Sequence, residues 1–132
     1  AVAIPQYQNY VAKSQVSRVM AETGALRTVI ETCMMEGRDD TTTPACELGW
    51  THSNLLGDGD GFDTQEGLEV EIDLEENTAS ITATFGGNAA AALRNGGELS
   101  WDRDEDGIWT CDTENIDDKF IPAGCTGEED AG

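Results

Sequence analysis

Proline, histidine and basic residues are scarce in this 132-residue sequence, which has three prolines, one histidine and seven lysines and arginines. Because His52 is the only histidine and no CxxC pair occurs, a zinc site is disfavoured. The Gly-x-Ser-x-Gly, phosphate-loop and HExxH signatures of common enzyme classes are absent, and no cysteine pairs with a histidine. These absences predict a protein without enzymatic activity and without a cofactor.

Long apolar runs are also lacking. The first four residues, AVAI, form an apolar run that ends at Pro5, far short of the ~20 residues that cross a bilayer. No signal peptide is recognisable. We therefore expect that a longer apolar helix precedes Ala1 in the full-length protein.

Negative charge is abundant. The chain has 27 acidic and seven basic residues, which give a net charge of −20. Such a field repels nucleic-acid backbones and anionic membranes, so nucleic acid is not an expected partner of this domain. Two interpretations of the acidity stay open: solubility in saline or calcium-rich surroundings, and cation binding.

Four cysteines form an even set in a short chain, which favours disulfides. Three connectivities are possible, and the pairing of Cys33 with Cys46 and of Cys111 with Cys125 closes the shortest loops. Two disulfides indicate an oxidising compartment, either the periplasm, the cell surface or the extracellular space. In the chain-entropy model each loop would stabilise the fold by about 3 kcal/mol.

The start of the chain predicts one long amphipathic helix. Between Gln6 and Glu36 there is no proline and a single glycine, and apolar or small residues recur at alternating steps of four and three. Gly37 is expected to cap its C-terminus. A helix longer than about 40 Å exceeds what this domain needs, so we expect a partner to cover part of it. The expected assembly face comprises Pro5, Tyr7, Tyr10, Val16, Val19, Leu26 and Ile30.

The second half of the sequence predicts an antiparallel meander of four strands. LEVEIDL alternates apolar and acidic residues, TASITATF continues after a turn, and GELSW and IWTC flank the turn DRDEDG. A helix followed by such a meander is an α+β layer packing. The expected divisions are the helix (1–36), a connecting loop (37–67), the meander (68–112), the cysteine-bounded region (111–125) and an acidic tail (126–132).

Two acidic, glycine-containing turns have the composition of weak calcium sites. DRDEDG matches only the first half of an EF-hand loop, because Thr113 stands where the twelfth residue should be glutamate. A solvated hairpin turn is the plainer interpretation. Neither turn predicts a firm metal site, and the weak candidate ligands are Asp58, Asp60, Asp63, Asp102, Asp104 and Asp106.

Several segments carry a resemblance to a known family. The opening AIPQYQNYVAKSQVSRVMAETGALRTVIETC, the segments GWTHSNLL, ITATFGGNAAAAL and IWTC, and the ring that ends in DKFIPAGC resemble type IVa pilins. These proteins are the subunits of thin bacterial surface filaments. With its two cysteine pairs, the chain is most similar to the two-disulfide, fimbrial or PilA-type major pilins.

The resemblance implies a ladle-shaped fold, in which a long N-terminal helix packs on a four-stranded antiparallel sheet. It implies that an apolar half-helix, absent from this soluble form, precedes the Ile-Pro-x-Tyr segment. The implied partners are other copies of the chain in a helical filament and the assembly machinery in the inner membrane. The precursor would be anchored in that membrane and the mature protein would lie in the surface pilus.

The cysteine-bounded ring is the implied adhesive region, in contact with a host or abiotic surface and with neighbouring subunits. Phe120 and Ile121 are expected to pack against the domain, while the acids of the ring stay in water. Twitching motility and DNA uptake are functions of some pilins, and the acidity argues against the second. The implied surface residues are Asp112, Glu114, Asp117, Asp118, Lys119, Phe120 and Pro122.

Two alternatives stay open at this point. Within the same superfamily, the chain could be a minor pilin or a secretion-system pseudopilin. In a different class, it could be a secreted calcium-binding or adhesin module. A short basic leader ending in glycine, followed by phenylalanine and a glutamate within an apolar run, would identify a pilin.

Overall fold

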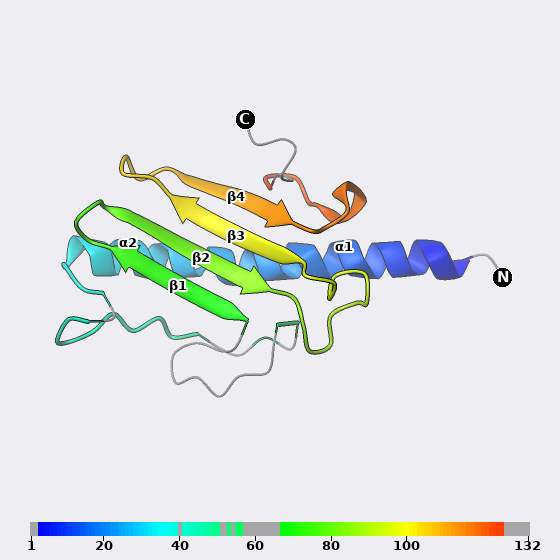
Figure 1. Cartoon of the computed structure of the whole chain (residues 1–132), viewed down its shortest axis with the longest axis horizontal. Helices are drawn as coiled ribbons and strands as arrows, with labels where there is room; N and C mark the ends of the chain where they lie inside the picture. Colours follow the sequence, from blue (N-terminus) through cyan, green and yellow to red (C-terminus); the bar gives the residue numbers. More distant parts are fainter. Residues whose placement is uncertain (1–2, 40, 51–52, 54, 57–66, 126–132) are drawn as a thin grey trace.

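The computed structural model describes residues 3–39, 41–50, 53, 55–56 and 67–125, with side chains in the first helix from Asn9 onward. A long helical segment lies across one face of a four-stranded antiparallel sheet with strand order β1-β2-β3-β4 (Figure 1). The α+β prediction is confirmed. The elements are α1 (Ala3–Gly24), α2 (Leu26–Met35), β1 (Leu68–Asp73), β2 (Thr78–Thr84), β3 (Glu98–Arg103), β4 (Trp109–Glu114) and the 3₁₀ helix η1 (Asp118–Phe120).

The two helices run in line, as the prediction of one long helix requires (Figure 1). Ala25 between them keeps helical angles, φ −65° and ψ −24°, and its N–H donates to the Ala21 carbonyl at 3.2 Å. The helical segment ends at Gly37, which has a φ of +70°. The Gly37 N–H donates to Met34 and the Arg38 N–H to Cys33, the two hydrogen bonds of a Schellman cap. The predicted glycine cap is therefore confirmed.

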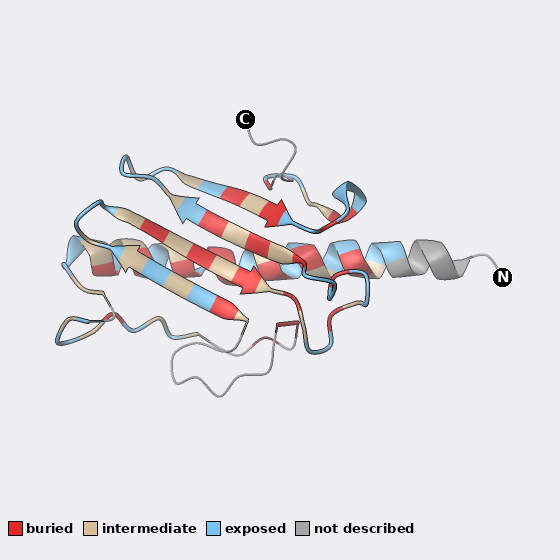
Figure 2. Cartoon of the chain, viewed as in Figure 1, coloured by how far each residue is buried: buried red, intermediate tan, exposed pale blue. Residues whose placement is uncertain are grey.

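The sheet alternates between a face that packs on the helix and a face that points away from it. Along β2, Ala79, Ile81 and Ala83 are buried and the residues between them are half-buried. Ile81 pairs with Val70 on β1 and with Trp101 on β3, so the buried positions line up across the sheet (Figure 2). β1, β2 and β3 match the predicted strands to within two residues. β4 continues to Glu114, three residues past the predicted strand IWTC and beyond the expected end of the meander at residue 112.

The core forms where the apolar stripe of the helices meets the inner face of the sheet. Val16, Val19 and Ile30 are fully buried, and Leu26 is 4% exposed. The prediction that these four residues belong to an assembly face is wrong, because the domain's own sheet covers them. Tyr10 is different, since its side chain is 73% exposed.

The other two residues of the expected assembly face, Pro5 and Tyr7, lie in α1, and their side chains are outside the described part of the structure. Figure 1 shows that the first turns of α1 extend past the sheet. For these turns and for the exposed Tyr10, assembly with a partner stays a prediction. No helix among the described residues is long and apolar enough to span a membrane.

One polar contact at the centre of the core fixes the helix to the sheet. The Trp101 indole N–H donates to the Thr23 hydroxyl at 3.1 Å, and this hydroxyl donates to the Val19 carbonyl at 2.7 Å. The Arg27 guanidinium lies 4.0 Å from the centroid of the Trp101 ring. Gly24 lies beside this contact, where a Cβ would be in ordinary van der Waals contact, 3.4 Å from both Arg27 and Trp101.

The 85–97 connection between β2 and β3 is a series of turns that packs on the helix. It buries Ala89 and Leu93, and the Ala90 N–H donates to the Gln15 side chain of α1 at 2.7 Å. Gly97 ends the connection, where a Cβ would lie only 2.5 Å from the Leu93 carbonyl oxygen. The connection is thereby held against the N-terminal part of the described helix.

Candidate functional site

Both disulfides have the pairing that closes the shortest loops. Cys33 of α2 is bonded to Cys46, and Cys111 of β4 is bonded to Cys125. The first bond fixes the start of the 37–67 loop to the helix. The second closes a ring, residues 111–125, that returns the chain from the edge strand to the domain. The predicted connectivity is confirmed.

The ring is packed against the domain along much of its length. Phe120 and Ile116 are 5% and 8% exposed, and η1 contacts α1. Asn115 adopts a φ of +59° and its side-chain amide donates to the Gly96 carbonyl at 3.1 Å. Asp117 caps η1 by accepting the Lys119 N–H at 3.1 Å. The ring is therefore an integral part of the domain and exposes only some of its side chains to solvent.

The predicted surface residues of the ring divide into three groups. Glu114, Asp117, Asp118 and Lys119 are exposed, whereas Asp112 and Pro122 are half-buried. Phe120 is buried, which confirms that it packs against the domain and makes its assignment as a surface contact wrong. The Phe120 side chain is buried although its neighbours in the ring are exposed acids, because η1 packs against α1.

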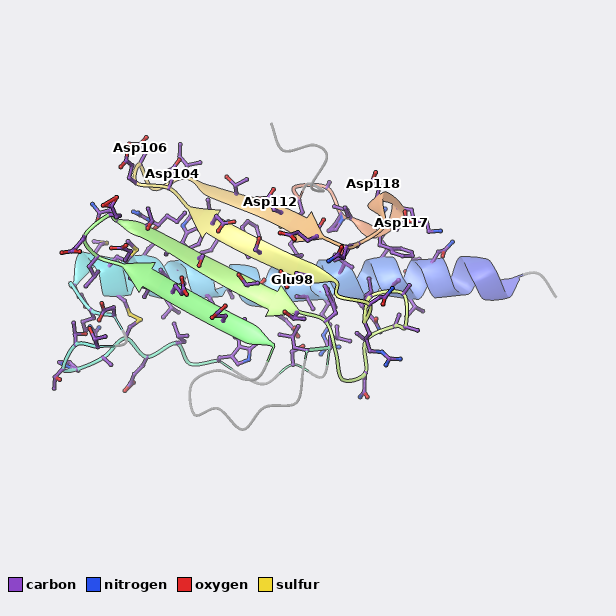
Figure 3. All side chains as sticks on the ribbon, in the orientation of Figure 1. Glu98, Asp104, Asp106, Asp112, Asp117 and Asp118 are labelled. Atoms are coloured by element: carbon purple, nitrogen blue, oxygen red, sulfur yellow. A yellow bond between two sulfur atoms is a disulfide. The ribbon has the colours of Figure 1, made fainter. Side chains whose placement is uncertain are left out.

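The outer face of the sheet is acidic and carries no basic side chain on the four strands. Asp112 and Glu98 are labelled on this face in Figure 3. Asp102 also lies on this face. Its pKa is raised mainly by partial desolvation and further by the Asp112 charge, and a hydrogen bond with Ser100 lowers it in part. Serine and threonine fill the positions between the acids. The acidic residues of this face are Glu69, Glu71, Asp73, Glu98, Asp102, Asp112 and Glu114.

The candidate calcium ligands in DRDEDG form a hairpin turn. The Asp104 carboxylate accepts the N–H groups of Asp106 and Ile108, both at 2.9 Å, and Gly107 adopts a φ of +87°. Asp58, Asp60 and Asp63 lie outside the described residues. Within the described ranges, no three or more histidine, cysteine or acidic side chains are grouped so as to hold a metal ion.

A second helix-to-sheet contact lies at the C-terminal end of the helix. Glu31 of α2 accepts hydrogen bonds from Arg103 Nε at 2.5 Å and from Trp109 Nε1 at 3.0 Å. Arg103 also donates to the carbonyl groups of Asn77 and Asp104. This contact could not be predicted from the sequence, because its partners lie more than 70 positions apart.

Acidification is expected to remove the stabilising effect of Glu31. The Arg103 hydrogen bond outweighs partial burial and, with Trp109 and the Arg103 charge, lowers the pKa of Glu31 from 4.5. A lowered pKa in the folded state means that the contribution is present above pH 4.5 and is lost as the pH falls through the lowered value. Since the pair is partly exposed, we expect Glu31→Gln to cost less than about 1 kcal/mol.

Urea unfolding of the wild type and of Glu31→Gln between pH 7 and pH 3 checks this prediction. The difference in the free energy of unfolding should shrink toward zero at the acid end. Glu69→Gln, at an exposed position on β1, is the matched control for the loss of one negative charge. A Glu31→Gln difference that stayed constant over the whole range would contradict the assignment.

The fold and the ring together define a class of protein: a helix-on-sheet domain whose helix extends past the sheet and whose residues 111–125 are closed into a ring by a disulfide. The family model for pilin, a bacterial filament protein, matches residues 12–126. The chain therefore belongs to the pilin family, as the resemblance predicted.

Individual relatives agree with this assignment. The chain is 48% identical over 135 residues to the type IV major fimbrial protein FimA of Dichelobacter nodosus, covering 95% of this chain and 83% of that protein. It is 36% identical to a fimbrial protein of Pseudomonas aeruginosa, over 84% of this chain and 71% of that protein. The crystal structure of a Cs1 pilin chimera has the same fold, with a TM-score of 0.69 at 23% identity, over 89% of this chain and 98% of that one.

Proposed function

We propose that this chain is the major structural subunit of a type IV pilus, with a structural and not a catalytic role. The observation that carries the proposal is its identity of 48% to a type IV major fimbrial protein over 95% of the chain. The role of a major subunit is favoured over that of a minor one, because the identity to a probable minor fimbrial protein of Dichelobacter nodosus is lower, at 35%.

The proposed partners are other copies of the same chain in a helical filament, assembled by machinery in the inner membrane. Exposed Tyr10 and the first turns of α1, which extend past the sheet, support this proposal (Figure 1). In a filament, a neighbouring subunit would cover the exposed Tyr10 side chain. A membrane-anchored precursor and a surface filament follow from the same proposal.

The experiment is a deletion of the gene for this chain, followed by complementation. Filaments sheared from the cells should disappear in the deletion strain and return with the wild-type gene. Two results together would show that the proposed function is wrong: the deletion strain keeps its filaments, and filaments sheared from the wild type do not contain this chain.

Adhesion through the ring is the second part of the proposal. Glu114 and Asp118 are exposed, whereas the apolar residues beneath them are packed on the domain. A rigid ring with exposed carboxylates is suited to cationic groups on a host or abiotic surface, since it presents them at little cost in conformational entropy.

Glu114→Gln with Asp118→Asn is expected to lower the attachment of piliated cells to aminated glass at least threefold when equal amounts of filament are compared. The matched control is Glu69→Gln with Glu71→Gln, on the outer face of β1, where two exposed charges are also lost. Equal attachment of the two variants would refute a specific role of the ring.

A further inference from the structure

Charge is distributed unevenly between the two ends of the domain. We define the distal end as the described residues of 36–47, 74–77 and 104–108, which lie where α2 terminates. The proximal end comprises α1 from residue 9 onward, the 85–97 connection and residues 115–125. Figure 1 shows the two hairpin turns and the end of α2 at one end of the sheet, and the 85–97 connection, residues 115–125 and the N-terminal half of α1 at the other, while the C-terminal half of α1 runs beneath the sheet.

The distal end is one assembled acidic surface. It carries eight acidic side chains and one basic side chain, Arg38, which is paired with Glu36. Arg103 holds its parts together by donating to Asn77 and Asp104, one in each hairpin turn, and to Glu31 of α2. The acids of these turns are exposed, and Asp104 and Asp106 are labelled at this end in Figure 3.

The proximal end has the opposite balance, with four basic and three acidic side chains. Arg18 is paired with Glu22. Lys13, Arg94 and Lys119 are exposed, and none of the three forms an ion pair within the described part of the chain.

The three cations come from separate segments that meet on α1. The 85–97 connection, which carries Arg94, is bonded to Gln15, two residues from Lys13. The η1 helix, which carries Lys119, packs on α1. In a chain with a net charge of −20, the exposed basic side chains that form no ion pair within the described residues thus lie at this end, whereas Arg27 is half-buried and stacks on Trp101.

We propose that the proximal end of one copy docks on the distal end of another, through Lys13, Arg94 and Lys119 against the acids of the two hairpin turns. The inference rests on the proposed function, because it names the contact by which copies stack along the filament. The two ends are different surfaces of the same chain, so their contact is heterologous. A heterologous contact that does not close into a ring generates an open helical filament.

Electrostatics also explains why the pattern favours this orientation. Two proximal ends gain nothing from each other, and two distal ends repel strongly. Opposite patches steer encounter and fix the register of an interface. Over the ~8 Å Debye length at physiological ionic strength, contact between the ends is attractive while the acidic outer faces of the sheets repel.

Charge reversal in the full-length protein, expressed in cells that lack their own copy of the gene, tests the proposal. The proximal variant is K13E/R94E/K119E and the distal variant is E75K/E76K/E105K. Each is expected to lower the yield of sheared filaments at least tenfold. The chain that carries both sets, with inverted but complementary ends, should recover to within threefold of the wild type.

Net charge alone predicts a different result. The distal variant is less negative than the wild type, so relief of general repulsion would raise its yield. The control E69K/E71K/E98K changes the net charge equally on the outer face of the sheet and should assemble like the wild type. Thermal unfolding of each 132-residue variant chain checks folding. If the proximal reversal does not fold, K13Q/R94Q/K119Q replaces it, with at least a threefold loss of filaments expected.

Normal filament yield in either the proximal or the distal variant, or a combined variant no better than the proximal one, would overturn the end-to-end contact. Wild-type filaments from the same preparation distinguish a failure of the proposed contact from a failure of the proposed function. Wild-type filaments built from the chain uphold the proposed function whatever the variants do. Absence of the wild-type chain from the filaments would overturn the proposed function and the contact together.

Discussion

Replacing Cys111 and Cys125 together by alanine is expected to lower the free energy of unfolding by about 3 kcal/mol. The bond closes a ring between the edge strand β4 and the end of the described chain. Both cysteines are buried, and Phe120 and Ile116 keep the ring packed only while its ends are held. Residues 115–125 should therefore open before the helix does.

Chemical denaturation and hydrogen exchange measure the two parts of this prediction. Amide protection should fall in residues 115–125 and in β4 of the variant, while α1 and α2 keep theirs. Replacing Cys33 and Cys46 by alanine is the matched control, since it removes a loop of similar length and leaves the ring closed. A C111A/C125A variant with full protection in the ring, or with normal assembly and adhesion, would refute the role assigned to the bond.

Trp101→Ala is expected to cost about 3–5 kcal/mol, the usual range for removing a large buried aromatic side chain. Trp101 is 6% exposed and contacts α1 through Thr23 and α2 through Arg27. Its loss would leave a cavity between helix and sheet and would remove the hydrogen-bond donor to the buried Thr23 hydroxyl. Urea unfolding followed by circular dichroism measures the change.

Two further variants separate volume from hydrogen bonding at this position. Trp101→Phe keeps most of the volume and loses the indole N–H, so its cost should be about 1–2 kcal/mol. Trp109→Phe is the matched control, because Trp109 is half-buried and donates to the partly exposed Glu31. An equal cost for Trp101→Phe and Trp109→Phe would contradict the central place of the Trp101 contact.

Much of the fold could be predicted from local patterns. The period-two alternation in LEVEIDL and TASITATF located β1 and β2, because each strand has one face on the core. The glycine at position 37 marked the end of the helix, because it takes the positive φ of the cap. The cysteine pairing followed from loop length. These features depend on residues close together in the sequence.

The features that sequence reasoning missed depend on distant residues. The period of the helix identified Val16, Val19 and Ile30 as one face, but it cannot say whether a sheet of the same chain or a neighbouring subunit covers that face. The proximal cations are separated by up to 106 positions, from Lys13 to Lys119, and only the topology brings their segments onto α1. Phe120 was predicted both to pack on the domain and to belong to the ring surface, and only the fold decides that its side chain is buried.

The most direct measurement is a cryo-electron microscopy reconstruction of filaments sheared from cells that carry the wild-type gene. We expect the density to trace this fold in every subunit, with parallel helices toward the filament axis. The proximal cations of one copy should face the acidic hairpin turns of another. Filaments built from a different chain would contradict the account.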